Sequence, residues 1–216
     1  MRTFAAIVMF LAISVANASA QTELSFYGGA QSAPHSGVSG TDPGGIGPFD
    51  FNAGWEGRPF TAPPYYGVRL TWWQNDDWGW GVDFSHDKVY ADAATLSANG
   101  LSVLEFSDGL NILTFNGYRK WDDFGGAFVP YVGAGVGVSL PHVEFDSGAG
   151  RTFEYQLGGP AVSVIAGARY PLGDRWSLFG EYKGTYSINN LDLVSGGNLS
   201  TNIVTNSFNL GATFGF

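Results

Sequence analysis

The sequence predicts an all-β fold: an eight-stranded antiparallel transmembrane up-and-down β-barrel with short periplasmic turns and long outer loops. The first observation is the final segment, in which every second residue is apolar: Phe208, Leu210, Ala212, Phe214 and Phe216. A barrel strand needs such a pattern because one face meets lipid and the other a polar interior. The second observation is that only 13% of the residues are charged and 16% are aromatic, whereas about a quarter are charged in an ordinary soluble domain.

A secretion signal at the amino terminus is the third observation. Arg2 gives a positive start, residues 4–16 are apolar but too few for a membrane-spanning helix, and Ala18-Ser19-Ala20 is a small-residue cleavage pattern. We therefore expect residues 1–20 to be a signal peptide and residues 21–216 to form the outer-membrane β-barrel. The chain contains no cysteine, so we expect neither a lipoprotein anchor nor disulfides. Its net charge of −9 argues against nucleic acid as a partner.

Eight segments with a period of two residues lie between turn signals. In chain order they are 22–31, 63–74, 78–85, 109–120, 128–140, 161–170, 176–188 and 203–216. The apolar faces of the first three carry Leu24 and Phe26, Val68 and Leu70, and Val82 and Phe84. The fourth has an ambiguous phase, because Ile112-Leu113 and Thr114-Phe115 break the alternation. The fifth, sixth and eighth carry Val132 and Val136, Val162 and Val164, and Phe208 and Leu210, and the seventh places Glu181 and Lys183 inward.

The lengths of the connections predict the orientation. Turns such as Asn75-Asp76-Asp77 and Leu172-Gly173-Asp174 are short, whereas 32–62 is long and rich in Gly and Pro, and the other odd-to-even connections exceed ten residues. Short turns face the periplasm in bacterial barrels. Aromatic residues near the short turns then fit a headgroup-level girdle: Trp73, Trp78, Trp121, Phe124, Tyr170 and Trp176. A soluble β-sandwich or lipocalin-like barrel would also alternate, but its polar face should carry more Lys and Glu.

Charged residues on the inward face predict a filled interior. They are Glu23, Arg69, Asp83, Arg169, Glu181 and Lys183, beside Tyr27, Tyr131 and Asn209. An eight-stranded barrel has room only for its own side chains. We therefore expect three cations paired with three anions, and no conducting pore.

All three histidines fall near the outer ends of strands: His35, His86 and His142. Asp87 and Glu144 lie within two residues of His86 and His142. Imidazole and carboxylate groups suit a divalent transition metal, and they also serve as general bases. Solvated loop residues are the alternative interpretation. Basic residues in or beside the outer loops are Arg58, Lys88 and Arg151, which suit phosphate or carboxylate groups of lipopolysaccharide or, more simply, pair with the acidic residues.

Five segments resemble the outer-membrane lipid A oxidase family. They are ELSFYGGAQSAPHSGVSG (23–40), GWEGRPF (54–60), WGWGVDFSHDKVYAD (78–92), YVGAGVGVSLPHVE (131–144) and FGEYKGTYSIN (179–189). The resemblance spans the whole mature chain. It implies a small barrel that oxidises the proximal glucosamine of lipid A to 2-aminogluconate with molecular oxygen, and it brings no catalytic residues with it.

On that resemblance we predict metal ligands or bases at His35, His86 and His142, with Glu144 and Asp87 as further ligands or bases. Arg58, Lys88 and Arg151 would hold the lipid's anionic groups. The expected cofactor is a divalent transition metal, since dioxygen reacts sluggishly with sugars and no flavin-binding motif is present. The expected partners are outer-membrane lipid and lipid A, and we expect a monomer. Two other functions stay open: a non-catalytic structural or binding barrel, and a lipid A acyl hydrolase.

Overall fold

The structure, a computed structural model, describes residues 21–122 and 125–216. The predicted signal peptide, residues 1–20, and Phe124 of the predicted girdle lie outside the described residues. Within the described ranges, no helix has the length and apolar character needed to cross a membrane.

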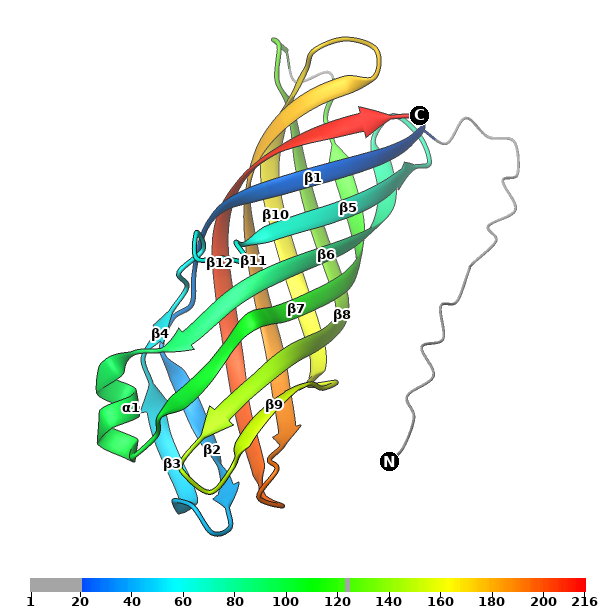
Figure 1. The fold of residues 1–216 in the computed structure, drawn as a ribbon. Helices are drawn as coiled ribbons and strands as arrows, with labels where there is room; N and C mark the ends of the chain where they lie inside the picture. The colour runs from blue at the N-terminus through cyan, green and yellow to red at the C-terminus, as the bar shows by residue number, and fades with distance from the viewer. Residues whose placement is uncertain (1–20, 123–124) are drawn as a thin grey trace.

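Eight antiparallel strands close into a ring (Figure 1). They are β1 (Gln21–Ser32), β5 (Tyr66–Trp73), β6 (Trp78–Ala91), β7 (Val103–Lys120), β8 (Val129–Asp146), β10 (Gly159–Pro171), β11 (Trp176–Asp192) and β12 (Asn198–Gly215). Each strand pairs with the next, and β12 pairs back to β1. Closure gives every ring strand a neighbour on both sides, which satisfies backbone hydrogen bonds where no water can do so. The predicted eight-stranded barrel is confirmed.

The two ends of the ring differ in their connections. Residues 74–77 and 172–175 are short turns at the end that holds the C-terminus (Figure 1). The opposite end carries β2 (Ser36–Asp42), β3 (Gly47–Ala53), β4 (Trp55–Glu56), α1 (Ala93–Asn99) and β9 (Arg151–Tyr155). Because short turns face the periplasm in barrels of this kind, the opposite end is the outer one.

The outer loops are more ordered than the sequence suggests. The stretch 32–62 contains the β2–β3 hairpin, and β2 pairs with the outer end of β12. The last loop, expected to exceed ten residues, is only 193–197, because β11 ends at Asp192 and β12 begins at Asn198. Above the bilayer a strand needs no apolar face, so polar pairs such as Asn189 with Thr201 continue the ladder.

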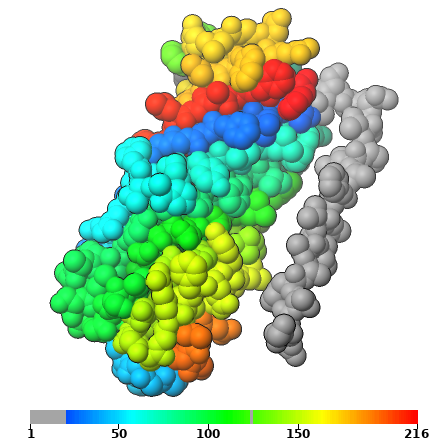
Figure 2. Space-filling view, in the orientation of Figure 1, coloured from blue at the N-terminus to red at the C-terminus, as the bar shows by residue number. Residues whose placement is uncertain are grey.

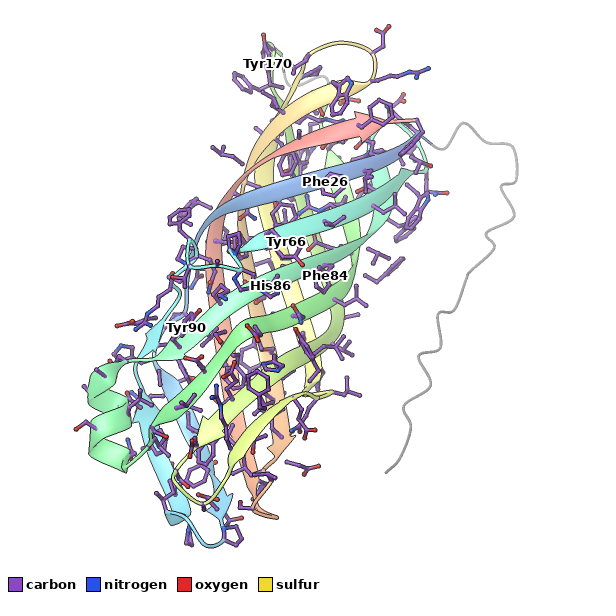
Figure 3. All side chains as sticks on the ribbon, in the orientation of Figure 1. Phe26, Tyr66, Phe84, His86, Tyr90 and Tyr170 are labelled. Carbon is purple, nitrogen blue, oxygen red and sulfur yellow. The ribbon has the colours of Figure 1, made fainter. Side chains whose placement is uncertain are left out.

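The outward face around the middle of the barrel is apolar and exposed. Its most exposed side chains include Phe26 (57%), Val136 (66%), Phe208 (71%) and Leu210 (76%). Figure 3 shows Phe26, Tyr66 and Phe84 along this wall. Such a belt matches the hydrocarbon layer of a membrane.

The aromatic girdle at the short-turn end is confirmed in part. Trp78 and Trp176 are 51% and 55% exposed, and Tyr170 lies at this end in Figure 3. The prediction that Trp73 belongs to the girdle is wrong. Trp73 is buried inside the barrel, where the Lys120 ammonium lies over its ring. The strand alternation explains this, because Trp73 shares the inward face with Arg69 and Thr71.

The interior of the membrane-crossing part is filled by paired charges, as predicted. Arg69 donates to Asp83 at 2.7 Å and to both carboxylate oxygens of Glu181 at 2.8 Å. Lys183 pairs with Asp83, and Tyr27 donates to the same carboxylate at 2.8 Å. The remaining contacts are Tyr131 and Asn209 to Glu181 and Arg169 to Glu23. Buried charges need such partners to be tolerated.

A second, apolar layer fills the interior at the outer end of the barrel, beyond these charges. Its fully buried members include Val38, Phe106, Val143, Phe145, Leu199 and Ile203. Val38 belongs to β2, which pairs with β12, so the first outer loop extends the barrel wall at the outer end and contributes to this layer. This layer is not evident from the alternation of apolar residues, because it lies in segments beyond the bilayer that the sequence predicts to be loops.

Candidate functional site

Two irregularities in neighbouring strands mark a polar site on the outward face of the outer end. The β6–β7 register shifts between Asp87 and Val89, and the β7–β8 register shifts between Glu105 and Leu110. Gly109 takes a positive φ of 116° inside the second irregularity. Bulges of this kind re-aim side chains and often lie beside functional sites.

We call the side chains gathered here the outer-wall cluster: Lys88, Glu105, Ser107, Asp108, His142, Glu144 and Arg151. They come from β6, β7, β8 and β9. Figure 2 shows these strands side by side as green and yellow-green atoms at the outer end. His142 follows the first residue of β8, Val129, by 13 positions (142 − 129). Because about 9–11 residues cross the hydrocarbon, the cluster lies just beyond it.

His142 is a ligand-type side chain of the cluster that is almost fully enclosed. It is only 5% exposed, and the rings of Phe153 and Tyr155 lie edge-on to its ring, with centroids at 4.5 and 4.6 Å. Its Nδ1 is 3.5 Å from Oε1 of Glu144 and 3.8 Å from Oδ2 of Asp108. Nδ1 is buried and makes no hydrogen bond. Two aromatic neighbours therefore aim an unpaired nitrogen at two carboxylates.

Neighbouring groups hold the Glu144 carboxylate and the backbone of Asp108. Glu144 accepts from Arg151. The Ser107 hydroxyl lies 2.8 Å from Oε1 of Glu105 and 3.1 Å from Oε1 of Glu144, so the two carboxylates share its single proton. The Tyr155 hydroxyl donates to the backbone carbonyl of Asp108 at 2.9 Å, which fixes the irregular part of β7. The hydrogen bond from Arg151 to Glu144 raises the pKa of the guanidinium further above its ordinary value. The Glu144 carboxylate and the backbone that carries Asp108 are thus positioned before any ligand arrives.

Lys88 neutralises part of this acidic charge. It is fully buried, its ammonium donates to the backbone carbonyl of Ser107, and it lies 5.5 Å from the centroid of the Tyr90 ring. Burial lowers the pKa of Lys88, and the carboxylates of Asp108, Glu105 and Glu144 oppose that effect. Glu105 and Glu144 are direct cross-strand partners, an arrangement that repels unless a cation lies between them.

The structure separates the other predicted residues. His86 stacks on Tyr66 at 5.1 Å and its Nδ1 is 2.9 Å from the Asn111 side-chain oxygen. His35 is exposed and lies near Asp92. Asp87 points into the barrel, where Ser85 donates to it at 2.7 Å. The three histidines therefore do not gather into one site.

The predicted cations lie along the same outward row as the cluster. Arg58 pairs with Glu56 and lies 4.8 Å above the Tyr90 ring, on the side of β6 opposite the carboxylates. Arg151 stands at the far end, on Glu144. Sequence reasoning missed Asp108, and the signal that could have found it is the Asp108-Gly109 pair, which interrupts the alternation of β7.

Comparison with known proteins gives structural likeness only. No protein-family model and no curated protein matches the sequence. Neisserial surface protein A (NspA) superimposes with a TM-score of 0.51 at 13% identity, covering 90% of this chain and 97% of that one. The fold is that of the small eight-stranded outer-membrane barrels. The N-terminal barrel domain of Pseudomonas aeruginosa OprF (14% identity, 91% and 97% covered, TM-score 0.45) and Ail of Yersinia pestis (11%, 88% and 98%, 0.39) also match, more distantly.

The fold and the apolar belt agree on location. An outward apolar wall around a polar interior belongs in a bilayer, and this barrel type belongs to the bacterial outer membrane. The outer-wall cluster therefore faces the outer leaflet.

Proposed function

We propose that this chain is a non-conducting outer-membrane barrel that binds anionic lipid headgroups, those of lipid A above all, along its outer wall. Two stacked layers fill the interior, so the outward face is the surface left for function. The observation that carries the proposal is the row of cations on that face. Arg58 and Lys88 both contact the Tyr90 ring, and Arg151 lies beyond them on Glu144.

The accessible cations suit phosphate. The side chains of Arg58 and Arg151 are each 49% exposed, so their remaining N–H groups are open to a ligand. Arginine binds phosphate through paired, charge-assisted hydrogen bonds. Their position just beyond the hydrocarbon is the level at which the phosphates of an outer-leaflet lipid lie.

Binding can be measured on the refolded mature barrel in detergent micelles. Titration with lipid A should give saturable binding that weakens about 10-fold or more in Arg151→Gln, because a hydrogen bond to a charged group contributes roughly 1.5–3 kcal/mol. Arg175→Gln is the matched control, since Arg175 is exposed in a periplasmic turn. Equal weakening by both variants would show charge attraction without a site and refute the proposal.

Lipid A oxidation is a second candidate function, favoured by the imidazole and carboxylates beside these cations. In this reaction the substrate is a lipid A without a phosphate on its anomeric oxygen: a base takes the proton of the free anomeric hydroxyl, and the hydrogen on the same carbon leaves with its electron pair. Dioxygen accepts both hydrogens and becomes hydrogen peroxide, and water opens the resulting lactone to the acid. His142 or Glu144 would be the base, and Arg151, which pairs with Glu144, would hold a phosphate of the lipid.

The mass of the lipid distinguishes the candidate functions. Lipid A without the anomeric phosphate, incubated in air with the barrel, should gain one oxygen atom if it is oxidised, lose an acyl chain if it is hydrolysed, and keep its mass if the barrel only binds. Oxidation should vanish in His142→Ala and persist in His35→Ala. An unchanged mass with saturable binding would remove the oxidase and keep the binding barrel.

A further inference from the structure

We propose that Asp108, His142 and Glu144 form a binding site for one first-row divalent metal ion on the outer wall. This metal site can be tested without lipid oxidation, because the measurement detects the bound metal itself. It also replaces the ligand set predicted from the sequence, since His35 and His86 have other surroundings.

The spacing of the three donor atoms fits a metal better than it fits hydrogen bonds. One oxygen from each carboxylate and Nδ1 of His142 all lie within 4.8 Å of one another. The two distances from Nδ1, 3.5 and 3.8 Å, are too long for a good hydrogen bond. With metal–ligand bonds of about 2.0–2.2 Å, tetrahedral ligands stand roughly 3.4 Å apart, so small movements complete the site.

The unpaired ring nitrogen of His142 is a second observation in favour of a metal ion, independent of the spacing of the donor atoms. A buried ring nitrogen without a partner is costly, and native structures seldom leave one unexplained. Nδ1 of His142 is buried and unpaired while it points at two carboxylates. A metal ion between the three groups would satisfy it.

Neighbouring groups supply the support that metal ligands usually have. Arg151 and Ser107 hold Glu144, and Phe153 and Tyr155 hold the ring of His142. Such contacts orient ligands and tune metal affinity. The Asp108 side chain is 46% exposed, whereas those of His142 and Glu144 are 6% and 4% exposed. The open side at Asp108 would leave a coordination position for water or for an oxygen of a headgroup.

The positive charge of Lys88 should lower the affinity of the site for a metal ion. Asp108, Glu105 and Glu144 carry three negative charges, and the positive charges of Lys88 and Arg151 offset two of them. The ammonium of Lys88 donates to the backbone carbonyl of Ser107, next to Asp108, and would repel a divalent ion bound by these carboxylates. Removing that ammonium should tighten metal binding, whereas it would weaken a site that binds anions.

One imidazole and two carboxylates suit Zn²⁺, Mn²⁺ or Fe²⁺. We would titrate Zn²⁺ and Co²⁺ into the untagged mature barrel in detergent micelles, with calorimetry for Zn²⁺ and visible absorption for Co²⁺. One ion per chain is expected, and each of His142→Ala, Glu144→Gln and Asp108→Asn should bind about 10-fold more weakly or worse. His35→Ala should bind like the unmodified barrel, and Lys88→Met should bind more tightly.

Folding of each variant is checked by circular dichroism. Asp108→Asn decides the matter if the two variants of buried residues fail to fold, because Asp108 is half exposed and the substitution keeps its shape. No saturable binding to the unmodified barrel, or equal binding to it and to Asp108→Asn, would overturn the proposal.

Discussion

The ring of Tyr118 lies against the backbone of Gly133, its direct partner across β7 and β8. A Cβ atom on Gly133 would stand only 2.6 Å from two carbons of that ring. The glycine therefore makes the room that a buried tyrosine needs inside a narrow barrel. The lack of a side chain at Gly133 is thus a packing requirement of the barrel interior.

Gly133→Ala should destabilise the barrel by about 1–3 kcal/mol, the usual cost of an extra methyl group in a packed interior. Gly117→Ala is the matched control, because Gly117 lies on the outward face and its nearest contact would be a carbon of Trp80 at 4.0 Å. Urea unfolding of the barrel in lipid vesicles measures both. Similar stabilities for the two variants would show that the Tyr118 ring moves aside freely.

Arg69→Met should cost about 3–5 kcal/mol of unfolding free energy, because it leaves Glu181 and part of Asp83 buried without their cation. Arg58→Met provides the comparison: its ion pair with Glu56 is half exposed, and such pairs contribute about 0–1 kcal/mol. The same vesicle-based unfolding experiment applies. A loss below about 1 kcal/mol for Arg69→Met would mean that water replaces the guanidinium.

The sequence predicts the part of the barrel inside the bilayer better than the part beyond it. Inside the bilayer, lipid on one side and paired charges on the other enforce a period of two, so the inward positions of Arg69 and Glu181 follow from the pattern. Beyond the bilayer that constraint ends, and the strands continue through polar pairs such as Asn189 and Thr201. The sequence therefore predicts the ring but misses its outer extension and the apolar layer within it.

The candidate site shows the same limit. His142 and Glu144, two residues apart on one strand, share a face, and that is readable from the spacing. Asp108 joins them only because the β7–β8 register shifts, and a shift of register depends on tertiary pairing. Asp87 does not join the site. It points into the barrel, whereas its neighbour His86 faces outward, as adjacent residues of a strand do.

The interior layers predict an electrically silent barrel. Reconstituted in planar bilayers, the chain should show no steady ion conductance, because paired charges fill the membrane-crossing part and apolar side chains fill the outer part. Arg69→Met should stay silent as well, since the apolar layer remains. A general porin recorded in the same bilayer is the positive control, and stable conductance steps from the unmodified chain would contradict the two-layer interior.

The first outer loop should depend on the apolar layer for its order. Phe145 is 1% exposed, and Phe49 of β3 stacks on it at 5.9 Å, so this contact anchors the β2–β3 hairpin to the barrel. Phe145→Ala removes the anchor at a cost of about 3–5 kcal/mol. We expect local opening, because the membrane-crossing ring keeps its own pairing. Limited proteolysis should then cleave the stretch 36–53 faster in Phe145→Ala than in Leu157→Ala, whose side chain is 65% exposed. Equal cleavage rates would show that backbone pairing of β2 with β12 holds the loop without the aromatic contact.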